Sequence, residues 1–277
     1  MRGSLSQLWG VVWYELRLQW VRRSLPIMGV CFALILLLFL FLVTGELEQA
    51  PEAGEEIKKT AVTFSLILGV TPVSLLLVLL ALPPVLAETV ARDQQFGLDE
   101  LRDTLPFSPG LYLAGKVGGV WLGVGLMVGM VALLSALFAW VRLGPLHVVP
   151  YARIWLTTIL PAGLFVSGMS VLLAAAQPSR KRATLVGGMV ALYSMVTVVF
   201  TVNRVYDWLH AAMPSAWFTV AMRTAFQYMA ETVELPAPLL PMADVPMAFV
   251  RQTAVATALQ LFFAWLLMVG WWRWRRA

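Results

Sequence analysis

The sequence has little charge: Asp, Glu, Lys and Arg make up only 13% of its 277 residues, where a soluble domain carries roughly 25%. Hydrophobic residues make up 60%, and the mean hydropathy is +0.80. This composition argues against a water-soluble fold and predicts an integral protein of the lipid bilayer. The net charge of +5 comes from cations beside apolar segments, without a long basic run, so we expect no nucleic-acid partner.

Cysteine and histidine are also scarce. Cys31 is the single cysteine, so no intrachain disulfide can form, and we expect it to be a small buried residue within an apolar run. The two histidines, His147 and His210, lie far apart in the sequence and have no ligand-spaced partner. The sequence therefore predicts no metal site and no cofactor of its own.

Nucleotide-binding and hydrolytic motifs are missing as well. The chain has no GxxxxGK[ST] phosphate loop, and the Gly115-Lys116 pair is not followed by Ser or Thr. Ser167-Gly168 lacks the first glycine of a GxSG pattern, because Phe165 stands there. We therefore expect no enzymatic activity in this chain, and an intramembrane enzyme is disfavoured.

Six apolar segments are long enough to cross a bilayer, which takes about 20 residues. We expect six transmembrane helices at 26–44, 62–86, 112–141, 154–176, 183–202 and 252–272. Six spans place both termini on one side of the membrane. The loops on that side carry most of the Lys and Arg residues, including the turn Arg180-Lys181-Arg182, so both termini are predicted to be cytoplasmic, in the cell (inner) membrane.

The spans themselves hold almost no ionisable residues, which at membrane depth usually mark ion sites or proton relays. We expect Lys116, near a cytoplasmic end, to extend its ammonium group to the interface. Pro72 and the Pro83-Pro84 pair predict a kink in the second span. Three glycines at spacings of four, Gly115, Gly119 and Gly123, predict a stripe for close helix packing. The helix that packs on this stripe belongs either to the same chain or to another one.

Two segments outside the spans have helical patterns. Residues 1–25 carry apolar residues on one helical face, which are Leu5, Trp9, Val12, Leu16 and Trp20, while Glu15 and Arg17 fall elsewhere. This pattern predicts an amphipathic helix in the cytoplasmic interface; the alternative is an ordinary extension. The external segment 203–250 is too apolar for a solvated linker, so we expect short re-entrant helices, the alternative being a mobile loop.

The loop 87–111 has the clearest polar pattern. Leu98, Leu101 and Leu105 form an apolar stripe on a short helix that Pro106 ends. The remaining face and the approach to it are charged: Arg92, Asp93, Asp99, Glu100, Arg102 and Asp103. The stripe could pack on the bilayer, on the chain itself or on another protein. Its acidic face favours a protein groove, because the inner leaflet is anionic. Ser108-Pro109 then predicts the start of the next helix.

Two stretches, WYELRLQWVRRSLP and ARDQQFGLDELRDTLPFSPGLYLAGKVGG, make the chain similar to the permease subunits of ABC-2-type ABC transporters. The first resembles the family's interfacial helix, and the second resembles its segment after the second span. The resemblance implies a dimer with a second permease copy or a homologous permease. It also implies that a separate cytosolic ATPase binds ATP and Mg and docks on a coupling helix in 87–111, through the residues named above.

The sequence therefore predicts an all-α membrane protein that serves as the permease of an ATP-driven exporter. An ion-driven secondary carrier, or a passive membrane subunit of another complex, is the alternative. An uncharged interior favours an apolar or amphipathic cargo such as a lipid, peptide or drug-like molecule.

Overall fold

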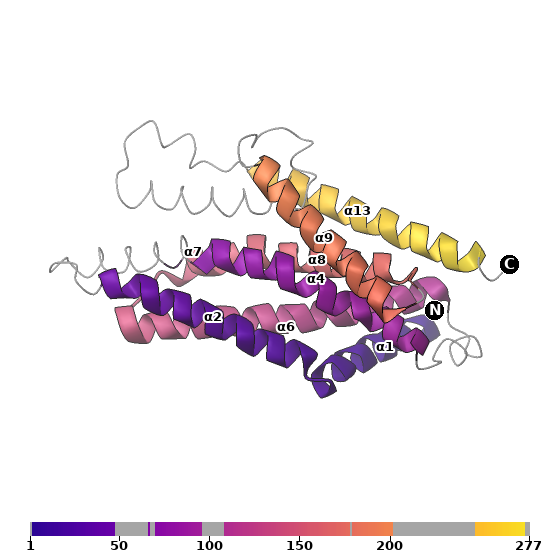
Figure 1. Cartoon of the computed structure of the whole chain (residues 1–277), viewed down its shortest axis with the longest axis horizontal. Helices are drawn as coiled ribbons and strands as arrows, with labels where there is room; N and C mark the ends of the chain where they lie inside the picture. The colour runs from indigo at the N-terminus through magenta and orange to yellow at the C-terminus, as the bar shows by residue number, and fades with distance from the viewer. Residues whose placement is uncertain are drawn as a thin grey trace.

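The structure, a computed structural model, describes residues 2–47, 66, 70–95, 108–177, 179–201 and 247–274. These residues form helices and short connections, without a strand among them, so the all-α prediction is confirmed for this part of the chain (Figure 1). The helices are α1 (Arg2–Val21), α2 (Ser24–Leu47), α4 (Thr71–Gln95), α6 (Pro109–Leu143), α7 (Val148–Ile154), the π-helical turn η2 (Trp155–Ile159), α8 (Leu160–Ala174), α9 (Arg180–Thr201) and α13 (Met247–Trp274).

Four helical segments in the described part are long and apolar enough to cross a membrane. They are Ser24–Leu42, Gly110–Arg142, Tyr151–Ala174 and Val250–Trp271, and α4 adds a shorter apolar segment, Val73–Thr89. Large apolar side chains on these helices point outward, for example Leu38, Leu133 and Leu267. Water would disfavour so much exposed apolar surface, whereas lipid does not. The protein is therefore a multi-pass membrane protein.

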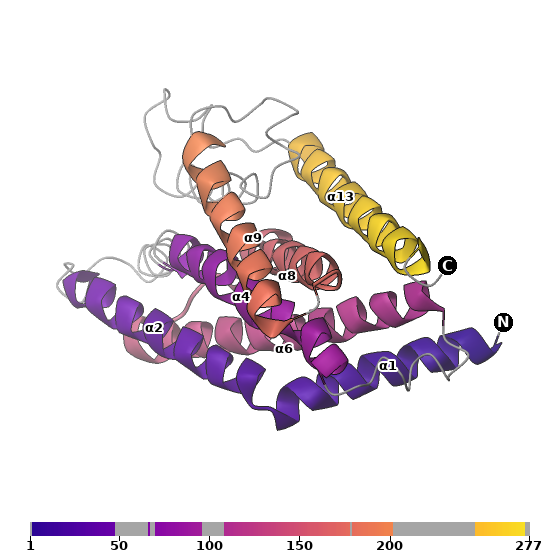
Figure 2. The ribbon, with the colours of Figure 1, turned by 45° about the vertical axis from the view of Figure 1, so that its right-hand side comes forward.

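The helices form a bundle whose longest dimension follows its membrane-spanning helices. In Figure 1, α2, α4, α6 and α8 run roughly along the long axis, while α9 crosses obliquely and α13 lies along one side. The shared core includes Leu36 from α2, Leu79 from α4, Val124 from α6 and Val166 from α8, all buried. The beginning of α1 and the end of α13 lie at the same end of the bundle, as Figures 1 and 2 both show.

Several helices extend beyond the apolar segments that the sequence indicates. α4 continues through Pro83 and Pro84 to Gln95, well past the expected end of the second span at residue 86. α6 is 35 residues long and begins as expected, since the Ser108 hydroxyl accepts a hydrogen bond from the Leu111 amide at 3.2 Å and Pro109 takes the first helical position. That helix start is confirmed. α13 begins at Met247, inside the segment expected to be external.

Other expectations change or fall outside the described residues. The span expected at 154–176 is continuous with an earlier helix from Val148, through the π-helical turn. Cys31, expected to be buried, is exposed on α2, because it lies on the helix face away from the core. The predicted coupling helix over Leu98–Leu105 and most of the predicted re-entrant segment, residues 203–246, lie outside the described residues.

Candidate functional site

The predicted glycine stripe of α6 lies against α1. A Cβ atom built on Gly115 would come within 2.6 Å of Val11 Cγ1, and one on Gly119 would come within 2.6 Å of Glu15 Cβ. A Cβ on Gly123 would come within 2.5 Å of Gln19 Oε1. Distances this short do not occur between real side chains, so the absence of a side chain at these positions lets the two helices approach. The partner helix that the sequence left open is α1 of the same chain.

The two helices run parallel and in register. Glycines spaced by four residues on α6 meet Val11, Glu15 and Gln19, also spaced by four, in the same order. Figure 2 shows α1 alongside the first half of α6. This register buries Val12, Glu15 and Gln19 and leaves Trp9 and Trp20 exposed, each at 61%. The α1 face that packs on α6 is therefore partly polar, and its aromatic residues face outward.

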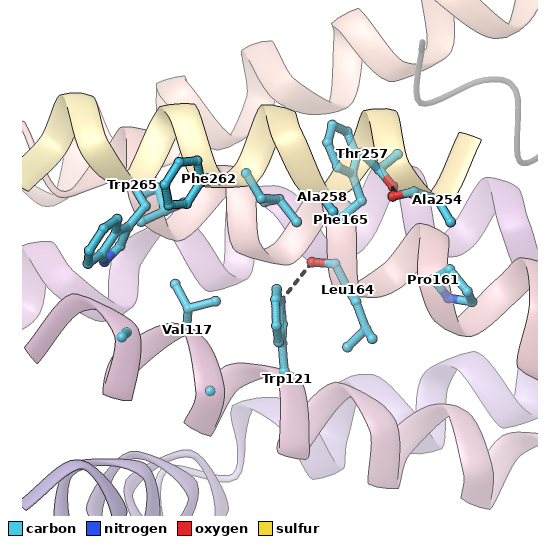
Figure 3. Close-up of a pocket in the computed structure, with 14 residues that line it drawn as sticks. Val117, Trp121, Pro161, Leu164, Phe165, Ala254, Thr257, Ala258, Phe262 and Trp265 are labelled. Atoms are coloured by element: carbon cyan, nitrogen blue, oxygen red, sulfur yellow. Dashed lines mark hydrogen bonds between the residues drawn. The ribbon is translucent and has the colours of Figure 1, made fainter. Parts of the chain in front are cut away.

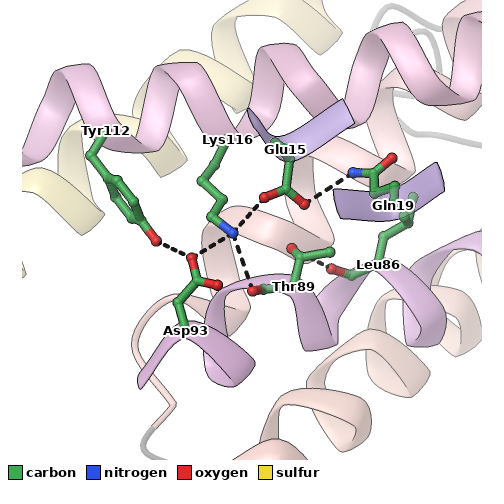
Figure 4. A network of polar contacts seen from close by, with 7 residues as sticks. All are labelled: Glu15, Gln19, Leu86, Thr89, Asp93, Tyr112 and Lys116. Atoms are coloured by element: carbon green, nitrogen blue, oxygen red, sulfur yellow. Dashed lines mark hydrogen bonds and ion pairs between the residues drawn. The ribbon is translucent and has the colours of Figure 1, made fainter. Parts of the chain in front are cut away.

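The buried glutamate meets a lysine and an aspartate from two other helices (Figure 4). Lys116 Nζ lies 2.5 Å from Glu15 Oε2 and 2.6 Å from Asp93 Oδ2. The same ammonium group donates to the Thr89 carbonyl oxygen at 3.3 Å. Relative exposures are 1% for Lys116, 1% for Glu15 and 3% for Asp93. We call Glu15, Asp93 and Lys116 the ion cluster; it joins α1, α4 and α6.

Further hydrogen bonds hold the two carboxylates in place. The Tyr112 hydroxyl donates to Asp93 Oδ2 at 2.5 Å, and Gln19 Nε2 donates to Glu15 Oε1 at 3.1 Å. Asp93 Oδ1 and Gln19 Oε1 are buried and accept no hydrogen bond within the described part of the chain. A lost partner in a buried ion pair costs about 3–5 kcal/mol. Loss of Lys116 in particular would leave two buried carboxylates without their counter-charge.

The ion cluster has a formal net charge of −1, because two carboxylates surround one ammonium group. Among the described residues no group of three or more His, Cys, Asp or Glu side chains gathers that could hold a metal ion. Chemically, the arrangement is suited to holding helices together.

The cluster corrects one sequence prediction about charge and shows where a second predicted residue lies. Lys116 does not extend to an interface: its ammonium group is buried between helices, because Glu15 and Asp93 supply its counter-charge. Asp93, predicted as a polar contact for an ATPase, points into the protein and is bound to Lys116 and Tyr112. Arg92 lies on the adjacent position of α4.

The other predicted coupling residues lie outside the described part: Leu98, Asp99, Glu100, Leu101, Arg102, Asp103 and Leu105. The ion cluster itself was missed by sequence reasoning. Its one sequence signal is that Lys116 directly follows a glycine of the packing stripe, so whatever covers that stripe lies near the lysine. No local pattern in the sequence identifies Glu15 as the partner of Lys116, because Glu15 precedes Lys116 by 101 residues.

A second feature is an apolar pocket of about 660 Å³ between α6, α8 and α13 (Figure 3). Aromatic side chains line it, among them Trp121, Phe165 and Trp265. Trp121 Nε1 donates to the Leu164 carbonyl oxygen at 2.8 Å, beside Gly168, where a Cβ would come within 3.1 Å of the indole nitrogen. Nearly all of the lining is apolar, so the pocket suits an apolar occupant.

Comparison with known proteins finds no family model that matches the chain, and no curated protein significantly similar to it. Helical architecture and apolar spans thus define the class, an all-helical multi-pass membrane protein. The ion cluster at the base of the segment between α4 and α6 is its candidate functional site.

Proposed function

We propose that the protein is the membrane-spanning permease subunit of an ATP-driven ABC exporter of the ABC-2 type. In this proposal the chain crosses the membrane six times, through α2, α4, α6, α7–α8, α9 and α13. It forms the translocation path together with a second permease copy or a homologous permease. A separate cytosolic ATPase binds ATP and Mg and docks on the segment that connects α4 to α6.

The observation that carries the proposal is the ion cluster, which lies at both ends of that connecting segment. Asp93 is two residues before the end of α4, while Tyr112 and Lys116 lie in the first two turns of α6. Their contacts join the two ends of the segment to each other, and Glu15 adds α1. A force applied to residues 96–107 by a partner would therefore act on three helices at once, which is what a coupling segment needs.

The placement of the basic residues supports the predicted orientation. α1 begins and α13 ends at one end of the bundle (Figure 1). The Trp265 indole on α13 donates to the Gly110 carbonyl oxygen at 3.2 Å, so the first turn of α6 lies at this end too. Arg180 at the start of α9 reaches Glu88 near the end of α4. Because Lys and Arg gather on the cytoplasmic side of membrane proteins, this end is proposed to be cytoplasmic.

The test is docking of the ATPase after a change in the connecting segment. We expect Leu101→Asp to abolish co-purification of a nucleotide-binding subunit in mild detergent, because it places a charge in the predicted apolar stripe, while membrane insertion is retained. Val21→Asp is the matched control, since Val21 is an exposed apolar residue at the end of α1. Full co-purification and transport with Leu101→Asp would refute the docking role.

A second candidate function is an ion-driven secondary carrier, and the same cluster favours it. Buried ionisable groups in membrane proteins often act as proton sites, and Asp93 Oδ1 has no hydrogen bond within the described part. Reconstitution of the purified chain in vesicles, without any ATPase, separates the two functions. Transport driven by a proton gradient and abolished by Asp93→Asn would support the carrier; transport that requires the ATPase and ATP would support the permease. A passive subunit would transport under neither condition.

A further inference from the structure

A second pocket, which we call the α4–α9 groove, lies on the outside of the bundle and has a volume of about 760 Å³. α4 contributes Pro84 and Glu88, and α9 contributes the remaining lining residues: Arg180, Lys181, Thr184, Leu185, Gly188, Met189 and Leu192. The lining therefore changes from charged at the start of α9 to apolar further along the helix. An amphipathic molecule, with a charged part and an apolar part, would match this lining.

The charged end of the groove is net positive. Within the described part of the chain, Glu88 is the one acidic residue that lines it, and it is already engaged by Arg180 at 2.8 Å and by the Thr184 hydroxyl at 3.1 Å. Lys181, which lines the groove, and the adjacent Arg182, which lies next to it in sequence but outside that lining, are both exposed. With Arg180 balanced by Glu88, the two further cations leave this end suited to an anionic group.

The apolar part continues as a strip on one face of α9. Leu185, Met189, Leu192 and Val196 recur at spacings of four and three, and all four are exposed. The strip is about 16 Å long at 1.5 Å per residue. One leaflet of a bilayer has a hydrocarbon depth of about 15 Å, half of the roughly 30 Å core. The strip is thus as long as one acyl chain in one leaflet.

We propose that the α4–α9 groove binds an anionic phospholipid from the leaflet on the side of the termini. The phosphate-containing headgroup contacts Lys181 and Arg182, and one acyl chain lies along Leu185, Met189 and Leu192. Gly188 leaves room for the chain, since a Cβ at this position would meet nothing within 4 Å. Basic pockets between transmembrane helices bind anionic headgroups in the same way. This inference rests on the groove and not on the proposed transport function.

The test is lipid titration of the full-length protein in neutral detergent, followed by native mass spectrometry. We expect dioleoylphosphatidylglycerol to bind more tightly than dioleoylphosphatidylcholine by a factor of ten or more. Each cation near an anionic lipid contributes a factor of about five. Replacing both with Lys181→Gln and Arg182→Gln should therefore weaken phosphatidylglycerol binding about 25-fold. Arg153→Gln, which removes an exposed cation elsewhere, should leave binding unchanged.

A matched pair of glycine variants tests the acyl-chain part. Gly188→Phe should fill the groove and abolish lipid binding. Gly129→Phe is the control, because Gly129 is also an exposed helical glycine whose Cβ would meet nothing within 4 Å. Both variants should insert and fold. Unchanged lipid binding by Gly188→Phe would overturn the proposal.

Two further outcomes would also overturn it. Full competition of inorganic phosphate with phosphatidylglycerol would indicate a site for a free anion. Disulfide cross-linking of Met189→Cys between two copies in native membranes, in a Cys31→Ala background, would indicate that a second copy of the chain covers the groove. Retention of phosphatidylglycerol in excess phosphate, without cross-linking, supports the lipid site.

Discussion

Replacing Lys116 with methionine is the most direct test of the ion cluster. The side chains are similar in length, so the substitution removes the charge with little change in packed volume. Two carboxylates, Glu15 and Asp93, are then left facing each other in a buried space without their shared cation. Breaking a buried ion pair by removing one partner costs about 3–5 kcal/mol.

The whole free energy of unfolding of a typical protein is about 5–15 kcal/mol, so the loss expected for Lys116→Met is a large part of it. The assay is unfolding in mixed micelles of a mild detergent and a denaturing one, followed by far-ultraviolet circular dichroism. The control is Lys181→Met, which changes an exposed lysine and should alter stability by no more than about 0.5 kcal/mol.

A compensated variant separates charge from packing. Lys116→Met combined with Glu15→Gln and Asp93→Asn removes the uncompensated charge, so we expect it to regain a substantial part of the lost stability. If Lys116→Met unfolds within about 1 kcal/mol of the unmodified protein, the cluster does not hold the three helices together. If the triple variant is no more stable than Lys116→Met alone, the loss comes from packing and the electrostatic argument is wrong.

Two further predictions concern α6. Gly119→Ala should destabilise the protein by about 1–3 kcal/mol through overpacking, because its Cβ would lie 2.9 Å from the Val12 carbonyl oxygen, a backbone atom. Gly129→Ala, in open space, should instead be neutral or stabilising by up to about 1 kcal/mol; equal effects of the two in the same unfolding assay would contradict the close packing of α1. Trp121→Phe removes the indole donor to the Leu164 carbonyl and should cost about 0.5–1.5 kcal/mol, checked by unfolding against Trp140→Phe, an exposed tryptophan on the same helix.

Local patterns in the sequence predict the helices well and their ends less well. Ser108 and Pro109 are a local signal for a helix start, and the structure confirms it. Hydropathy, by contrast, reports where the apolar segment ends, not where the helix ends. α4 therefore continues beyond residue 86, because its charged last turns are paired: Glu88 with Arg180, 92 residues later in the chain, and Asp93 with Lys116.

The ion cluster depends on the tertiary arrangement, which the sequence pattern does not contain. In α1, the predicted apolar face includes Trp9 and Trp20, which are exposed, but also Val12, which is buried against α6. The same pattern places Glu15 outside the apolar face. Only the position of the α6 glycines relative to α1 shows that Glu15 is buried, and this contact joins residues about a hundred positions apart.

The parallel contact between α1 and α6 also has a consequence for the order of events during synthesis. Glu15 leaves the ribosome 101 residues before Lys116, which at roughly 5–20 residues per second is an interval of about 5–20 s. During that time α1 has neither its glycine-lined neighbour nor its cation, so Glu15 must stay hydrated. α1 can therefore settle into its final position only after the first half of α6 has been made. α1 is translated before α6, but its packing is completed only afterwards.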